Sequence, residues 1–387
     1  MVFLMAFACA VSVANLYWVQ PLLDTLAKEF DASTTTAGLS VTFTQLGYVL
    51  GLIFIVPLGD ILERKRLIVS ISILTSLALV VAAFSPTIHF FLAASLLVGS
   101  ASVVVQILVP FAATLAGDHE RGKVVGQVMS GTLLGILFAR TLSGFISDLA
   151  GWRAVFGTAA VLMLGITILL DRTLPRYKHN LSLAYHRLLL SVLDLVKEER
   201  SLRIRSIYGG LVFANFGIFW TSMTFLLAGP PFHYSDALIG LFGLIGAAGA
   251  LSANIAGRLA DKGLTSITTI VFVLLNLLAF LLMLPGSNAV FYIIIGDLLL
   301  DAGVQGTHIT NQSVIYRLSP DVRSRITTAY MSVYFMGGTI GSALSAAIYP
   351  LAGWRGVSFL GIGFSLLAVG IWFYEKYVPD GENISFS

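Results

Sequence analysis

The sequence predicts an all-α integral membrane protein with twelve transmembrane helices in two six-helix bundles. Three observations support this fold class. The 387-residue chain is 57% hydrophobic and only 11% charged, apolar runs recur along its whole length, and one seven-residue phrase is written twice. Soluble domains carry about 25% charged residues. With so few charges, lipid must be the solvent for most of this chain.

Each predicted span is an apolar run of roughly 20 residues, long enough to cross a bilayer as a helix. The first run has no basic residue before Lys28, so we expect neither a cleaved signal peptide nor lipidation. It also starts at Met1 without a polar leader, which leaves a trimmed N-terminus as an alternative. We place the spans at 1–27, 36–58, 67–84, 88–115, 124–148, 154–171, 205–228, 237–257, 264–284, 289–315, 325–348 and 355–376.

The basic residues indicate how the chain is oriented. Alternate loops, together with Arg205, hold 18 of the 23 lysines and arginines. Basic loops of bacterial membrane proteins stay in the cytoplasm. We therefore expect an inner-membrane protein with both termini cytoplasmic. The basic loops are 59–66, 116–123, 172–204, 258–263 and 316–325.

The repeated phrase is LAGWRAV at 149–155 and LAGWRGV at 351–357. Other positions match at nearly the same offset, and six spans separate the two copies, so both lie on one membrane face. This pattern predicts a parallel repeat of two bundles. We interpret the two tryptophans as interfacial anchors. The expected domains are 1–171, a cytoplasmic linker at 172–204 with an amphipathic surface helix, and 205–387.

Two loops at matching places of the repeat carry a motif. PLGDILERKRL at 57–67 and GRLADKG at 257–263 resemble the signature loop of the major facilitator superfamily, roughly G-x-L-A-D-x-x-G-R-K. The first copy departs from the pattern at Val56 and Glu63, and the second has its later glycine one residue early. The resemblance covers nearly the whole chain and implies that family's fold and alternating-access transport.

Two further stretches, NLYWVQPLLDTLAKEF at 15–30 and LDAGVQGTHITNQSVIY at 300–316, resemble bacterial arabinose-efflux-like and drug-exporter permeases. The family resemblance also implies a cytoplasmic gate. Asp60 would meet the positive N-terminus of the span at 325–348, and Arg64 would reach the loop after the fourth span. The alternative is ordinary topology charges. The expected gating residues are Asp60, Arg64, Asp118, Glu120 and Asp261.

The fifth span, SGTLLGILFARTLSG at 130–144, keeps small residues at close spacing, which lets helices approach one another. Arg140 stands where exporters of the family usually have proline. A permanent cation in the membrane costs about 2.5–3.5 kcal/mol unless it is paired. We therefore expect an acidic or polar partner for Arg140, with Asp297 and Asp301 as candidates.

The tenth span places Asp297, Asp301 and Gln305 at intervals of four residues, on one helical face that His308 extends. Desolvation favours the protonated form of a carboxyl group. Asp301 is therefore our first candidate for carrying a proton, with Asp297 and His308 as neighbours that could assist. The alternative is that Asp301 hydrogen-bonds an adjacent helix and only fixes packing.

The resemblance implies that spans one, four, seven and ten line a central cavity. Polar and aromatic residues there suit a medium-sized, partly apolar solute. Each of them, taken alone, fits helix packing better than contact with a ligand. The cavity candidates are Asn15, Tyr17, Trp18, Gln20, Gln106, Arg140, Asn215, Trp220 and Gln305.

Enzyme signatures are missing from the sequence, which has no phosphate-binding loop, zinc-protease helix or nucleophile elbow. We expect no catalysis, no cofactor, no metal and, at a net charge of +3, no nucleic-acid partner. We predict a monomeric secondary transporter whose partners are a small solute, protons and the bilayer. Proton-coupled efflux is the first expectation and proton-coupled uptake the second. A non-transporting sensor or a decayed transporter is the alternative from another class.

Overall fold

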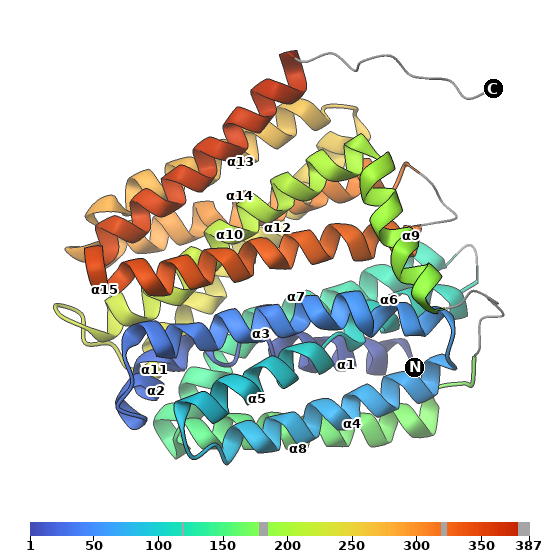
Figure 1. Ribbon diagram of the computed structural model, residues 1–387, viewed down its shortest axis with the longest axis horizontal. Coiled ribbons are helices and arrows are strands. Elements are labelled where there is room, and N and C mark those ends of the chain that lie inside the picture. The colour runs from blue at the N-terminus through green and yellow to red at the C-terminus, as the bar shows by residue number, and fades with distance from the viewer. Residues whose placement is uncertain (118–119, 178–184, 319–322, 378–387) are drawn as a thin grey trace.

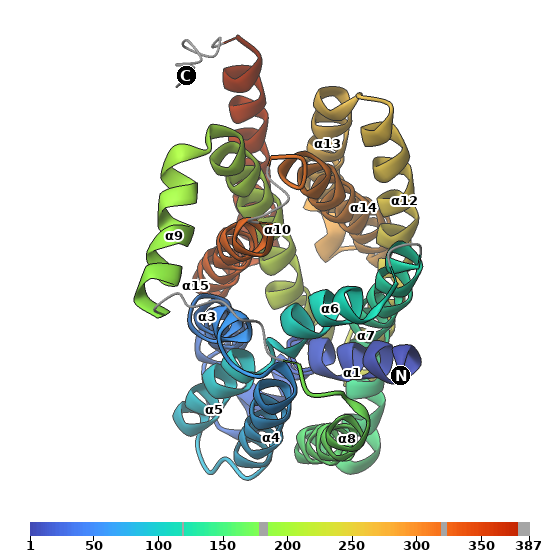
Figure 2. The same ribbon diagram turned by 90° about the vertical axis from the view of Figure 1, so that its right-hand side faces the viewer.

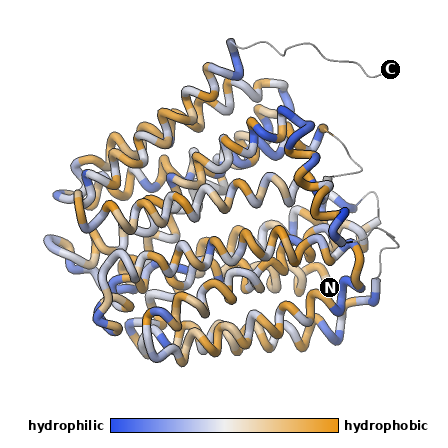
Figure 3. The backbone as a smooth tube through the Cα atoms, in the orientation of Figure 1, coloured by the Kyte–Doolittle hydropathy of each residue, from blue (hydrophilic) through white to orange (hydrophobic). Residues whose placement is uncertain are grey.

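The computed structural model consists of helices that run along one common direction (Figure 1). It describes residues 1–117, 120–177, 185–318 and 323–377. Within these ranges helices are the only regular secondary structure. Hydrophilic residues gather at the two ends of the helices and along the crossing helix α9 (Tyr185–Glu198), as Figure 3 shows. The long middles of the helices are apolar, as expected for lipid surroundings.

The first eight α-helices form one half of the molecule, with two 3₁₀ turns among them. The elements are α1 (Val2–Ala14), η1 (Gln20–Leu22), α2 (Leu23–Glu29), α3 (Thr34–Phe54), η2 (Val56–Asp60), α4 (Arg64–Ala83), α5 (Ile88–Ala101), α6 (Val104–Leu115), α7 (Arg121–Ala150) and α8 (Trp152–Thr173).

The second half follows α9 and repeats the same plan. Its elements are α10 (Arg200–Ala228), α11 (Asp236–Leu241), η3 (Phe242–Gly246), α12 (Ala247–Asp261), α13 (Thr265–Met283), η4 (Leu284–Ser287), α14 (Val290–Ile315) and α15 (Arg323–Tyr377). Figure 2 looks along the helices and separates the lower half, α1–α8, from the upper half, α10–α15.

The described residues contain ten helical stretches that are long and apolar enough to cross a membrane. The last of them, Ser324–Tyr377, contains two spans joined at Gly353, and the broken segment from α1 to α2 supplies one more. The predicted fold class, twelve helices in two bundles, is confirmed. We call the end of the bundle where α1 begins and α15 finishes the terminal end. The opposite end, with the loops between α2 and α3 and between α10 and α11, is the distal end (Figure 1).

The first span is not the continuous helix that the sequence predicts over 1–27. Helix α1 has only 13 residues and stops at Asn15. A chain of turns then leads into η1, whose second residue is Pro21, and into α2. Trp18 Nε1 donates to Asn15 Oδ1 at 3.0 Å within this break. Because proline removes a backbone donor, the helix cannot run through this point unchanged.

Side-chain caps fix helix starts at the distal end. Ser33 accepts a hydrogen bond from the backbone of Thr36 at 3.1 Å, and Thr87 does the same for Phe90 at 3.3 Å. Serine and threonine at the N-cap satisfy backbone N–H groups that have no partner inside the helix. These caps set where α3 and α5 turn back into the bilayer.

The repeated Gly-Trp-Arg phrase makes the same corner in both halves. Gly151 has φ +84° between α7 and α8, and Gly353 has φ +60° inside α15. Only glycine adopts such backbone without strain. Trp152 and Trp354 are each 3% exposed, and Trp354 Nε1 donates to the Met283 carbonyl at 2.7 Å. The prediction of interfacial anchors is therefore wrong, because both rings are buried in protein.

The two halves meet along two pairs of helices. Helix α3 packs against α15, and α7 packs against α11 and η3. Helix α9 lies across the terminal end and touches both halves, since it contacts η2, α10 and α15. Tyr185 of α9 donates to the Phe54 carbonyl at 2.7 Å. The candidate site lies between the halves.

Candidate functional site

Arg140 of α7 lies at the centre of the molecule and is 1% exposed. Its Nε donates to Gln20 Oε1 at 2.5 Å, and its Nη2 is buried without a hydrogen-bond partner. The guanidinium carbon lies 3.7 Å from the ring centroid of Trp220, and 4.7 and 5.2 Å from those of Tyr17 and Phe216. Aromatic faces attract a cation, most strongly when water is excluded. The polar partner that membrane burial demands is Gln20, from the same half.

Two carboxyl groups of α14 accompany this cation. Asp297 is fully buried and Asp301 is 5% exposed. Asp301 belongs to the other half of the molecule and can carry the charge opposite to that of Arg140, although no ion pair within 4 Å joins these two described residues. Both oxygens of Asp297, and Oδ1 of Asp301, have no hydrogen-bond partner. Gly246 allows η3 to lie close to Asp301, because a Cβ at this position would lie 2.8 Å from Asp301 Oδ2.

Aromatic rings line α10 and lead away from Arg140 towards the terminal end. Phe216 stacks on Phe213 with centroids 5.1 Å apart, and Phe213 stacks on Tyr334 of α15 at 4.1 Å. Phe213, Phe216 and Trp220 follow helical spacing, so all three share one face of α10. The stacked rings hold α10 against α15 and bury one another's faces.

His308 belongs to the far end of this aromatic row. Its ring centroid lies 4.7 Å from that of Tyr334, and its Nδ1 lies 3.0 Å from the hydroxyl of Tyr330, where either atom can donate. The predicted face of α14 does carry Asp297, Asp301 and His308. His308, however, packs against the rings of Tyr330 and Tyr334, and its hydrogen bond goes to Tyr330 and not to either aspartate. That bond ties α14 to α15.

Two predicted cavity residues, Gln106 and Asn215, bond neighbouring helices. Gln106 Nε2 donates to the Tyr48 hydroxyl at 3.1 Å, which ties α6 to α3. Asn215 Nδ2 donates to Ser365 Oγ at 2.8 Å, which ties α10 to the outermost part of α15. Asn15 accepts from Trp18, as described above. Gln305 is half-buried beside Gly249. The structure thus groups Tyr17, Gln20, Arg140, Trp220, Asp297 and Asp301, while Asn215 faces away from them.

A buried carboxylate closes the distal end. Asp236 of α11 accepts from Ser147 Oγ at 2.7 Å, and Thr25 Oγ1 lies 2.9 and 2.8 Å from its two oxygens. Asp148 accepts from the backbone of Ala237 at 3.3 Å. These bonds join α2 and α7 to α11, and so join the two halves. These bonds are not apparent from the sequence, because an aspartate in the first turn of a helix is an ordinary helix-start residue.

Glycines show that the two ends differ in packing. A side chain at Gly144 would clash with the Asp236 carbonyl, and one at Gly240 with the Arg140 carbonyl. At the terminal end, Gly122 and Gly126 of the same helix α7 have nothing within 4 Å. The halves therefore touch closely at the distal end, whereas Gly122 and Gly126 have open space beside them.

Comparison with known proteins decides the family. The model of the Major Facilitator Superfamily matches residues 3–306. The uncharacterized transporter YgaY of Escherichia coli O157:H7 is 50% identical over 383 residues, which cover 99% of this chain and 97% of the relative. The chain belongs to the major facilitator superfamily. Its relatives are membrane transporters, and the predicted resemblance is confirmed.

Solved members of the superfamily share the fold. A bacterial homologue of the human lysosomal transporter Spinster, in an inward-facing and unoccupied conformation, superposes with a TM-score of 0.78 at 14% identity, covering 96% of this chain and 95% of that one. The xylose transporter XylE of Escherichia coli, in a partially occluded inward-open conformation, gives 0.72 at 13% identity over 99% of both chains. At these identities the likeness concerns the fold alone.

The superfamily's signature loop can now be placed. Arg64 begins α4, lies 3.9 Å from Asp60 Oδ1, and donates to Thr114 Oγ1 of α6 at 3.1 Å. Its guanidinium also lies over the rings of Phe111 and Tyr177, at 5.8 and 5.4 Å. The arginine thus ties the loop to α6 and to the start of the linker.

The other predicted gating residues lie at the terminal end. Asp261 is the last residue of α12, and Glu120 directly precedes α7. Asp118 lies outside the described residues. No interaction given by the structure joins Arg64 to Glu120. The gating roles of these residues stay predictions.

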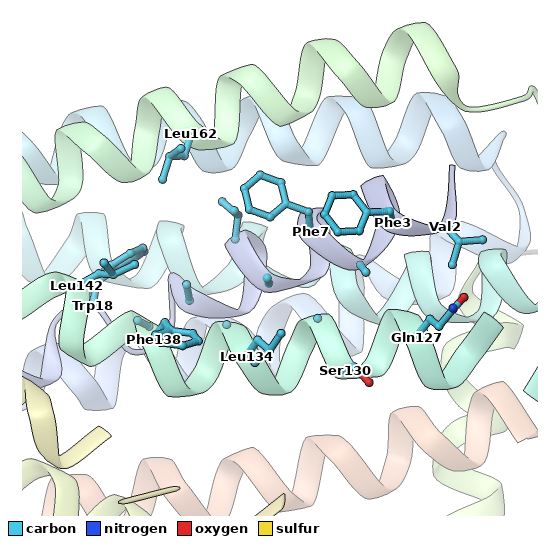
Figure 4. A pocket seen from close by; sticks show the side chains of 17 residues that line it. Val2, Phe3, Phe7, Trp18, Gln127, Ser130, Leu134, Phe138, Leu142 and Leu162 are labelled. Atoms are coloured by element: carbon cyan, nitrogen blue, oxygen red, sulfur yellow. The ribbon is translucent and has the colours of Figure 1, made fainter. Parts of the chain in front are cut away.

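An apolar groove, separate from the central site, lies on the outside of α1 and α7 (Figure 4). It has a volume of about 670 Å³ and is lined by Phe3, Phe7, Leu134 and Phe138 among others, with Gln127 and Ser130 among its few polar residues. Phe3 is 85% exposed there. Exposed apolar side chains of this kind suit acyl chains, so the groove belongs to the lipid-facing surface.

Proposed function

We propose that this protein is a proton-coupled secondary active transporter of a small organic solute, working by alternating access. The observation that carries the proposal is the buried group of one guanidinium and two carboxyls between the halves. Ionisable residues inside a membrane are costly and mark ion and substrate pathways. Arginine stays protonated in proteins. Only the carboxyls of this group can therefore bind and release the proton, and Asp301, the less deeply buried of the two, is the proposed carrier.

The orientation follows from the basic loops. The terminal end carries most of the lysines and arginines, so we assign it to the cytoplasm of the bacterial cell. On that assignment the distal end faces the periplasm. The contacts of Asp236, Ser147 and Thr25 then lie on the periplasmic side and hold the two halves together there.

Two directions of solute transport are candidates. The resemblance to exporters of the superfamily predicts proton-coupled efflux of a drug or sugar-like compound. Uptake together with protons is the second candidate, and a specific observation favours it. Arg140, a fixed cation, stands where such exporters usually have proline, and it can hold a substrate anion.

The test is solute flux in liposomes that contain the purified protein, with a solute identified by a thermal-shift screen. We expect an imposed pH gradient to drive accumulation of the solute. The Asp301→Asn variant keeps the shape of the side chain but cannot titrate, so it should lose pH-driven accumulation and retain solute exchange. Asp171→Asn, an exposed carboxyl at the end of α8, is the matched control.

Two results would contradict the proposal. Accumulation by Asp301→Asn that still follows the pH gradient would remove Asp301 as the coupling site. Absence of any solute flux in the unmodified protein, with solute binding intact, would favour the sensor or decayed-transporter alternative.

A further inference from the structure

The charges at the centre restrict which solutes the site can accept. Arg140 contributes one permanent positive charge, and Asp297 and Asp301 each contribute either none or one negative charge. Three net charges are therefore conceivable: +1, 0 and −1. A bound ion must balance one of these states, because an uncompensated charge in a dry interior is strongly unfavourable.

Asp297 decides among these states. It is fully buried, and neither of its oxygens has a hydrogen-bond partner. An ionised carboxylate without partners in an apolar environment costs far more than the neutral acid, so such a group neutralises instead. With Asp297 neutral, the site carries either no net charge, with Asp301 ionised, or a charge of +1, with Asp301 protonated. A cationic solute would need a site with a net charge of −1. That charge requires Asp297 to be ionised as well as Asp301, so it is the least favourable of the three.

An unpaired nitrogen of Arg140 also favours an anionic solute. Its Nη2 has no hydrogen-bond partner, although the residue is almost completely buried. A guanidinium binds carboxylate oxygens through paired N–H groups better than any other side chain. The faces of Trp220 and Phe216 adjoin the guanidinium, and the row of rings continues from there to Phe213. These rings are buried against one another here, and a flat apolar group attached to the carboxylate would pack along the row when the two halves separate.

We propose that the central site binds a monoanionic organic acid with a planar apolar body, held by Arg140 and the aromatic face of α10, and that Asp301 takes up one proton as the anion binds. The proton comes from the adjoining water, and no covalent bond changes. The anion replaces Asp301 as the counter-charge of Arg140. Anion and proton therefore bind to the same state of the protein.

The groups around Asp301 are consistent with a single titrating site. The ionisable groups close enough to affect its charge are Arg140 of α7, Tyr17 of the segment after α1, and Tyr334 of α15. Asp297 lies one turn away on α14. The two phenols carry no charge near neutral pH. Asp301 is thus the group whose proton balances a bound anion.

This inference rests on the proposed transport function and adds a direction of coupling to it. Solute and proton that bind together must cross together. The anion would then move with the proton, and an inward proton gradient would drive its uptake. Exchange of a cation against protons would require the opposite behaviour, in which solute and proton compete.

The test is isothermal titration calorimetry on the purified full-length protein with three probes of the same shape: benzoate, benzamide and benzylamine. Titrations in two buffers with different ionisation enthalpies give the number of protons taken up. We expect benzoate to bind with uptake of about one proton, and to bind about tenfold more weakly per pH unit above the range in which Asp301 is protonated. Benzamide and benzylamine should bind at least tenfold more weakly.

Variants separate the roles. Arg140→Gln should weaken benzoate binding at least tenfold, whereas Arg153→Gln, at an exposed arginine beside Glu29, should leave it unchanged. Asp301→Asn should bind benzoate without taking up a proton, a result that a merely destabilised variant would not give. A thermal-unfolding curve for each variant checks that it is folded.

Three results would overturn the inference: no binding of benzoate at millimolar concentration, equal binding of benzoate and benzamide, or tighter binding of benzylamine with release of a proton. These results leave the transport function standing if Asp301-dependent, pH-driven flux of another solute persists. Conversely, proton-linked benzoate binding without any flux would contradict the transport function and leave the assignment of the site intact.

Discussion

The closure of the distal end depends on hydrogen bonds to one carboxylate, and Thr25→Val tests it. The substitution keeps the shape of the side chain and removes the hydroxyl that donates to Asp236. Thr25 Oγ1 lies near both oxygens of that carboxylate, but it has one proton and makes one bond at a time. A hydrogen bond to a charged group contributes about 1.5–3 kcal/mol. Losing it only in the closed state should shift the equilibrium towards distal opening about 10- to 150-fold.

Distances between spin labels across the distal end report this shift. Cysteines at Lys28 and Leu238, which are exposed and lie on different halves, can carry the labels. The native cysteine, Cys9, is buried and should stay unlabelled. We expect a single short distance in the parent protein and a growing long-distance population in Thr25→Val. Ser147→Ala, which removes the second donor to the same carboxylate, should act in the same direction.

A matched control comes from a neutral bond across the same interface. Thr35 Oγ1 donates to the Ala346 carbonyl at 3.0 Å. Because neither group is charged, Thr35→Val should cost only about 0.5–1.5 kcal/mol and shift the distances less. Equal distance distributions in the parent protein and Thr25→Val would refute the reasoning, since the carboxylate would then contribute nothing to closure.

Three further outcomes are expected. Asp60→Asn should weaken the attraction to the start of α15 and favour opening at the terminal end; spin-label distances there that match those of the parent would contradict this. Gly353→Ala should lower the free energy of unfolding by about 1–3 kcal/mol, because its positive φ strains any side chain, whereas Gly370→Ala, with open space around it, should change the melting temperature little. Gly144→Leu should prevent close approach to Asp236 and hold the distal end open, measurable as accessibility of an engineered distal cysteine to a water-soluble maleimide; protection equal to that of the parent would rule it out.

Composition and repetition were enough to predict the fold. Apolar length locates helices because a bilayer leaves backbone groups no other partners, and the doubled phrase revealed two related halves. The same reasoning failed where a helix breaks inside an apolar run. The residues at the interruption after Asn15 and at the 3₁₀ turn at 242–246 are mostly apolar. The length of an apolar run therefore reveals neither break.

The central site was predicted in part. A charge in an apolar helix draws attention by its cost, which is why Arg140, Asp297 and Asp301 were named from the sequence. Their grouping across the two halves follows from packing, which no single helix displays. Phe213 and Phe216 were missed because an apolar aromatic in a membrane helix is unremarkable in sequence. Asn215 was assigned to the cavity on helix position alone, and its bond to Ser365 shows that it faces an outer helix.

Arg140 also has a consequence for how the chain is made. Ribosomes deliver α7 to the membrane before α10 and α14 exist, so the guanidinium enters the bilayer without the ring of Trp220 and without the carboxyl of Asp301. Until those arrive, Gln20 is its hydrogen-bond partner within the finished part of the chain. Insertion of a bare arginine costs about 2.5–3.5 kcal/mol. Within the first half, Arg140 therefore has only Gln20 and the ring of Tyr17 as neighbours given above, and the remaining contacts form when the second half is synthesised.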